Sequence, residues 1–108
     1  MMRDLSVSRD FSEFPFGRYP EHGPFNGQRF RDEFIKPALE QDEPVTVDLT
    51  GARGLAPSFL EECFGGLIRA GFSENRLRQL LTIRSDNDPS YIDEIWDYVH
   101  DAALATAH

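Results

Sequence analysis

Ser58 stands where a predicted strand and its loop lead into a predicted helix. Its hydroxyl can cap that helix, because Ser58 and Glu61 have the spacing of a capping box. The start of a helix also accommodates a phosphate, since free N–H groups and the positive end of the helix dipole favour negative charge. Phosphorylation would add about −1.5 to −2 charges and could remodel a docking surface. The spacing leaves two interpretations open: a plain cap, or a regulatory or ligand-contacting serine.

One basic cluster interrupts an otherwise acidic chain, next to a loop rich in glycine and proline. Converging arginine side chains and N–H groups can hold a phosphate, a nucleotide or a partner's carboxylate. The alternative is that these cations pair with neighbouring carboxylates on a solvated helix face. No Walker-type glycine-rich motif with Lys-Ser or Lys-Thr supports a nucleotide site. The candidate anion-binding residues are Arg18, His22, Arg29 and Arg31.

No catalytic constellation can be read from the residue spacing, so we expect no enzymatic activity. An enzyme would need Asp48, Ser58 and His22 to converge within hydrogen-bond reach, about 3 Å. Asp48 ends the clearest predicted strand, where a carboxylate without a visible partner is expected to order the following loop. We expect no metal and no cofactor, because His22, His100 and His108 lack ligand spacing.

Three further features each have an ordinary structural interpretation. Cys63 lies on the apolar face of a predicted helix and is expected to be a buried, inert thiol. Asp93, Asp97 and Asp101 recur at helical spacing, which suits either a solvated face or a surface for a basic partner. Gly51–Gly54 matches the GxxG loop of one RNA-binding module, but a match of four residues is weak.

The charge balance narrows the classes of partner. The chain has 11 basic and 19 acidic residues, for a net charge of −8. Such a chain repels phosphate backbones, so we expect neither nucleic acid nor an anionic membrane as a partner. No apolar run approaches the roughly 20 residues of a membrane span, and residues 1–10 are too polar for a signal peptide. With a single cysteine, these features predict a cytoplasmic protein and leave the oligomeric state open.

A chain of 108 residues predicts one domain, 1–108, with frayed ends at residues 1–3 and 104–108. Strands are predicted at residues 5–7, 14–19, 44–50 and 80–83. Helices are predicted after Asn26 as N-cap, over residues 58–70, and after Asp88-Pro89. Pro37 should kink or end the first helix, and Gly65-Gly66 should permit close backbone approach in the second. Alternation of strands with helices predicts an α/β fold with at least partly parallel strands.

Three stretches of the sequence resemble a known family. Val45–Leu49, the glycine-containing loop after it and Pro57–Leu67 are similar to the STAS-like domains of unknown function found in bacteria and phages, as is Gly27–Arg31. The resemblance covers roughly residues 15 to 100. It implies the STAS fold, a small mixed sheet of about four strands with three to four helices packed mostly on one face. That fold is best known from anti-sigma-factor antagonists.

The same resemblance implies a non-enzymatic regulatory or protein-interaction domain. In phospho-switch members of the superfamily, a kinase that is also the anti-sigma factor phosphorylates a serine at the position that matches Ser58. The implied partner is a kinase-like ATPase or an anti-sigma-like regulator, contacted by Ser58, Pro57, Phe59 and Arg53. Here Ala56, Pro57 and Phe59 replace the aspartate, small residue and glycine that usually surround that serine. The alternative function is a small-molecule module that binds a nucleotide or another anion through the basic cluster.

Overall fold

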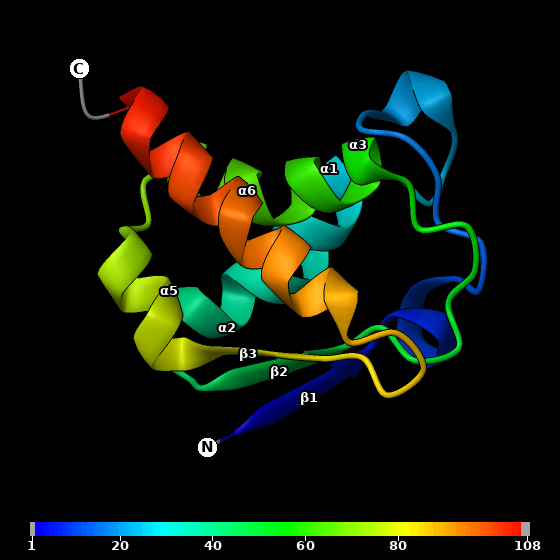
Figure 1. Cartoon of the computed structure of the whole chain (residues 1–108), viewed down its shortest axis with the longest axis horizontal. Coiled ribbons are helices and arrows are strands. Elements are labelled where there is room, and N and C mark those ends of the chain that lie inside the picture. The colour runs from blue at the N-terminus through cyan, green and yellow to red at the C-terminus, as the bar shows by residue number, and fades with distance from the viewer. Residues whose placement is uncertain (1, 107–108) are drawn as a thin grey trace.

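A three-stranded parallel sheet forms the base of the computed structural model, which describes residues 2–106 (Figure 1). The strands pair in register from first residue to last, in the order β1-β2-β3. Helical segments connect successive strands, as parallel pairing requires. The strands are β1 Arg3–Ser6, β2 Val45–Asp48 and β3 Leu81–Arg84.

Two helical bodies each contain a π-helical turn at their centre. The first body, residues 27–40, comprises α1 Gly27–Phe30, η3 Arg31–Ile35 and α2 Lys36–Glu40. The second body, residues 57–69, comprises α3 Pro57–Leu60, η4 Glu61–Gly65 and α4 Gly66–Arg69. The remaining segments are η1 Val7–Phe11, the 3₁₀ turn η2 Pro20–His22, α5 Glu74–Leu80 and α6 Ser90–Thr106. Within residues 2–106, no helix is both long enough and apolar enough to cross a membrane.

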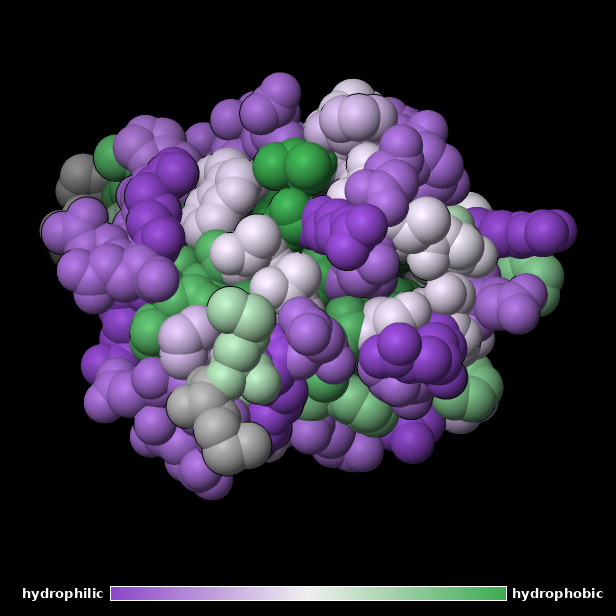
Figure 2. All heavy atoms as spheres, turned by 90° about the horizontal axis from the view of Figure 1, so that it is seen from below, coloured by the Kyte–Doolittle hydropathy of each residue, from purple (hydrophilic) through white to green (hydrophobic). Residues whose placement is uncertain are grey.

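The helices cover one face of the sheet and leave the other open (Figures 1 and 2). Val45, Val47 and Ile83 point into the core and are at most 6% exposed. The alternate residues of the strands form the open face, where Figure 2 shows hydrophilic and neutral residues with some hydrophobic ones between them. Parallel sheets are usually covered on both faces. Polar and charged residues at every second position, such as Thr82 and Arg84, make a solvated face stable here.

Phenylalanine dominates the core beneath the helices. Phe30 and Phe59 are at most 1% exposed, and Phe11 packs on Phe30 with their ring centroids 5.0 Å apart. Asn26 caps the first helical body as predicted, because its side chain accepts a hydrogen bond from the backbone N–H of Arg29 at 2.9 Å. These features confirm the predicted α/β fold with helices on one face.

The predicted fourth strand is wrong, as is the mixed character of the sheet. Residues 14–19 form a loop, in which Gly17 has a φ of 81° and Pro15 and Pro20 interrupt any extended run. All pairings in the described sheet are parallel. Among the terminal residues predicted to fray, Arg3 begins β1 and residues 104–106 complete α6. The rest of that prediction concerns residue 2, which precedes β1, and residues 1, 107 and 108, which lie outside the described residues.

The structure refines two predictions about the helices. Of the two alternatives for Pro37, an end of the helix near Lys36 is wrong, because the first helical body continues through Pro37 to Glu40 after a π-helical turn. The close backbone approach occurs at Gly27, where an added Cβ would lie 2.8 Å from the carbonyl oxygen of Phe59. Gly66 instead leaves room for the guanidinium of Arg31.

Candidate functional site

The two π-helical turns meet at a buried ion pair. Glu62 is 5% exposed, and its carboxylate contacts the guanidinium of Arg31. The same guanidinium nitrogen donates to the backbone carbonyl of Glu62 at 3.2 Å. A buried carboxylate is tolerated only when it is paired and hydrogen-bonded. Arg31 therefore joins the first helical body to the second.

Glu61, the neighbouring carboxylate, extends this pair into a network. It accepts hydrogen bonds from Arg18 at 2.5 Å and from Arg69 at 2.8 Å. Burial acts to raise the pKa of Glu61, but hydrogen bonds from Arg69 and Arg18 outweigh it and hold the pKa below its usual range. We call this network the ion-pair seam; its members are Arg18, Arg31, Glu61, Glu62 and Arg69.

The structure divides the predicted anion-binding cluster between two places. Arg18 and Arg31 belong to the ion-pair seam, where internal carboxylates already neutralise them. Arg29 lies against the touching rings of Phe11 and Phe25, with its guanidinium carbon 5.5 Å from each ring centre. The four candidates therefore do not converge on one point.

His22, the fourth candidate, orders the backbone of its own loop. Its Nδ1 accepts hydrogen bonds from the backbone N–H groups of Arg18, at 3.0 Å, and Tyr19, at 3.2 Å. Both bonds use Nδ1 as their acceptor, so this ring nitrogen is engaged within the loop. His22 is therefore a positioning residue for this loop.

Residues 12–25, which we call the aromatic loop, expose several large apolar rings. Phe14 and Phe16 are 63% and 64% exposed, and Tyr19 and Phe25 are close to two-fifths exposed. Backbone hydrogen bonds hold the loop, including one from Phe16 N–H to the carbonyl of Phe25 at 2.8 Å. Exposed aromatic side chains on an ordered backbone are typical of interaction surfaces.

This loop lies next to the segment that leads into α3 (Figure 1). The backbone N–H of Arg53 donates to the carbonyl of Glu13 at 2.7 Å, which ties the two segments together. Arg53 and Pro57 are exposed and Ser58 is half-buried, so all three are open to solvent beside the loop. Phe59 is 1% exposed and packs in the core, so it cannot touch a docked partner.

Ser58 does not cap its helix. The N-cap is Ala56, which has an extended backbone and no side-chain capping bond. Pro57 occupies the first helical position, where its missing N–H costs nothing. The predicted capping box is therefore wrong, since Glu61 is held by arginines of the ion-pair seam.

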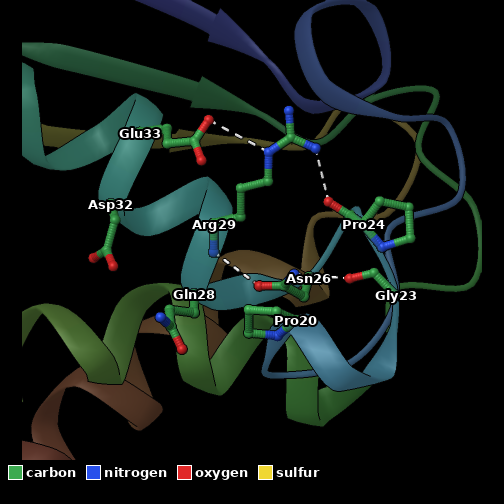
Figure 3. A pocket seen from close by; sticks show the side chains of 8 residues that line it. All are labelled: Pro20, Gly23, Pro24, Asn26, Gln28, Arg29, Asp32 and Glu33. Atoms are coloured by element: carbon green, nitrogen blue, oxygen red, sulfur yellow. Dashed lines mark hydrogen bonds and ion pairs between the residues drawn. The ribbon is translucent and has the colours of Figure 1, made fainter.

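A hollow of about 290 Å³ opens between η2 and α1, at the end of the aromatic loop (Figure 3). Arg29 crosses one side of it and donates to the carbonyl of Pro24 at 2.8 Å and to Glu33 at 3.3 Å. The lining residues are Pro20, Gly23, Pro24, Asn26, Gln28, Arg29, Asp32 and Glu33.

The structural interpretations of Asp48 and Cys63 are confirmed, while the exposure of three acidic residues on α6 suits both interpretations given for them. Asp48 accepts a hydrogen bond from the N–H of Thr50 at 2.9 Å and so orders the loop after β2. Burial raises the pKa of the Cys63 thiol well above its usual range, which keeps it unreactive. Asp93, Asp97 and Asp101 all lie on the exposed face of α6.

The sequence contained signals for the two features that were missed. The prolines and the glycine within residues 14–20 argue against a strand and for a turn that exposes its aromatic side chains. Glu61-Glu62 is a pair of acidic residues inside an otherwise apolar helix, and buried carboxylates need cationic partners. Arginine was the only abundant cation available to supply them, since the chain has one lysine.

Taken together, these observations define a small parallel α/β domain whose helices pack on one face of its sheet. The chain belongs to the family described as STAS-like domain of unknown function (DUF4325), whose model matches residues 26–91. No curated protein and no solved structure gives a significant match to the chain. The matched residues contain the ion-pair seam except Arg18, and they begin just after the aromatic loop.

Proposed function

We propose that this chain is a non-enzymatic protein-interaction domain that docks a partner on the aromatic loop. The observation that carries the proposal is the exposure of Phe14 and Phe16, each close to two-thirds, on a backbone held by hydrogen bonds. Phenylalanine side chains normally lie inside a monomer. An ordered loop that presents them has already lost the entropy that docking would otherwise cost.

A protein partner suits this surface better than a free anion. Arg18 and Arg31, which an anion would need, are neutralised by Glu61 and Glu62. The docking surface joins the aromatic loop to Arg53 and Pro57, which lie on the adjoining segment.

The proposal is tested by Phe16→p-benzoylphenylalanine and photo-crosslinking in the native host, with mass spectrometry of the adducts. A discrete partner protein should be captured, because position 16 would lie in the interface. The matched control is Leu104→p-benzoylphenylalanine, at a residue that is 55% exposed on α6. Absence of an adduct from position 16, or the same adducts from position 104, would overturn the proposal.

The finer proposal is that Ser58 regulates this docking and that the partner is a kinase-like ATPase or an anti-sigma-like regulator. Ser58 is half-buried in the first turn of α3, and its hydroxyl makes no capping bond. Transfer of a phosphoryl group from ATP to its Oγ would place about two negative charges beside the aromatic loop.

Substitutions at Ser58 test the regulatory part separately. Ser58→Asp should reduce the yield of the position-16 crosslink several-fold, whereas Ser58→Ala should leave it unchanged. Ser90→Asp is the control, because Ser90 is exposed in the first turn of α6. If Ser58→Asp has no effect and no phosphate is found on Ser58, the regulatory proposal fails while the docking proposal stands.

A further inference from the structure

We infer that the hollow between η2 and α1 receives a single apolar side chain from a short segment of the partner protein. This inference rests on the proposed docking function and names the part of the surface that anchors the partner. The hollow lies at the end of the aromatic loop, between Pro20 and Pro24, and Phe25 follows Pro24 directly. An anchor placed there would therefore lie close to Phe25, one of the partly exposed rings.

Several of the polar groups around the hollow already bond one another. The side chain of Asn26 donates to the carbonyl of Gly23 at 2.8 Å and accepts from the backbone N–H of Arg29 at 2.9 Å. The Arg29 guanidinium donates to the carbonyl of Pro24 and to Glu33. Figure 3 shows these bonds as a continuous chain along the wall.

The surface of the hollow that a ligand can contact is therefore mainly apolar. The rings of Pro20 and Pro24 and the aliphatic stem of Arg29 have no polar group that needs a partner. A charged ligand at the Arg29 wall would have to displace existing hydrogen bonds and would leave polar groups unpaired. An apolar side chain would displace only water.

The volume limits the size of the occupant. The hollow holds about 290 Å³, which lies at the lower end of the range of roughly 300–1,000 Å³ for small-molecule pockets. One leucine, phenylalanine or tryptophan side chain suits this space better than a nucleotide does. Central pockets that take one apolar or aromatic side chain are the usual hot spots of protein interfaces.

The exposed area of the four aromatic side chains suits a short segment of a partner better than a large interface between copies of the chain. Phe14, Phe16, Tyr19 and Phe25 together expose about 400 Å², if each ring offers about 200 Å². A standard interface buries about 800 Å² on each partner, and obligate dimers bury more. A peptide segment with one anchor residue matches the smaller area.

The test uses a single blocked amino acid as the probe. N-Acetyl-L-tryptophan amide should shift the backbone amide resonances of Gly23, Asn26 and Gln28 saturably in ¹H–¹⁵N spectra, with a millimolar Kd. N-Acetyl-L-aspartate amide and inorganic phosphate should not shift them. Saturable shifts with phosphate, or none with the tryptophan amide, would overturn the inference.

Two variants make the assignment specific to the hollow. Gln28→Phe should fill it and weaken tryptophan-amide binding at least ten-fold, while Pro20→Ser should weaken it by removing an apolar wall. Asp97→Asn, on the exposed face of α6, should bind like the parent. Dispersed spectra confirm that each variant is folded, and unchanged binding in both hollow variants would overturn the inference.

The two proposals fail separately. If position 16 crosslinks a partner but the tryptophan amide does not bind, docking stands and the anchor pocket is rejected. If the amide binds in the hollow but position 16 captures nothing, the docking function is rejected.

Discussion

In the ion-pair seam Glu62 is 5% exposed, whereas in the aromatic loop Phe16 is 64% exposed. The seam buries charge between two helical bodies, and the loop leaves apolar rings in solvent. The two regions touch through Arg18, which belongs to both. Residue type alone would have assigned binding to the arginines and packing to the phenylalanines.

The difference shows that a charged residue is available for binding only if the fold leaves it unpaired. The Arg31 guanidinium has several N–H donors, but the carboxylate and the backbone carbonyl of Glu62 already accept from it. The Phe14 ring is 63% exposed in a loop interrupted by Pro15 and Gly17, so it is available to a partner. A partner that buries Phe14 and Phe16 would gain about 25 cal/mol per Å² of apolar surface removed from water.

The largest effect is expected from breaking the seam. Glu62→Ala should lower the free energy of unfolding by about 3–5 kcal/mol, because it leaves the Arg31 guanidinium without its buried partner. Urea denaturation followed by circular dichroism measures this loss. Glu33→Gln removes an exposed i,i+4 pair with Arg29 and should cost under about 1 kcal/mol. Equal losses from the two substitutions would mean that the seam is no more than a surface contact.

A smaller, pH-dependent effect is expected from Glu61. Its pKa is lower in the folded chain than in the unfolded chain, so the unfolded state binds the proton more readily. The stabilisation is complete above the pKa of an unfolded glutamate, about 4.3, and is lost as the pH falls through the lower folded value.

Urea denaturation between pH 7 and pH 3 checks this sign. The parent should lose stability as the pH falls below about 4.3, and Glu61→Gln should lose less over the same range. Asp93→Asn, at an exposed position on α6, should keep the parent's slope. A Glu61→Gln slope as steep as that of the parent would contradict the assignment of Glu61 to the seam.

Much of the fold could be predicted because its signals are local. The β-branched run at 45–48, the side chain of Asn26 and the apolar stripes of the helices each act within a few residues. The resemblance to STAS-like domains also rested on contiguous stretches, and the family match at residues 26–91 confirms it.

The site was harder to predict because its contacts join distant residues. Arg31 and Glu62 are 31 positions apart, and Arg18 and Glu61 are 43 apart, so no local spacing pairs them. Ser58 had the local pattern of a cap, but Pro57 fits the first helical position and moves the cap to Ala56. The aromatic residues around Phe16 have a pattern typical of a strand, but Pro15 and Gly17 prevent regular hydrogen bonding to a neighbouring strand.

The smallest effect on stability is expected at Phe16, with the buried Phe59 as its reference. Phe59→Ala should cost about 3–5 kcal/mol, as much as breaking the seam, because it leaves a cavity next to Phe30 and Phe11. Phe16→Ser should change the free energy of unfolding by no more than about 0.5 kcal/mol, because a side chain 64% exposed loses little packing. The same urea experiment measures both. If Phe16→Ser destabilises the chain as much as Phe59→Ala does, the ring packs on the domain itself and is not held out for a partner. If it leaves stability unchanged, any loss of partner binding in that variant is caused by the missing ring and not by unfolding.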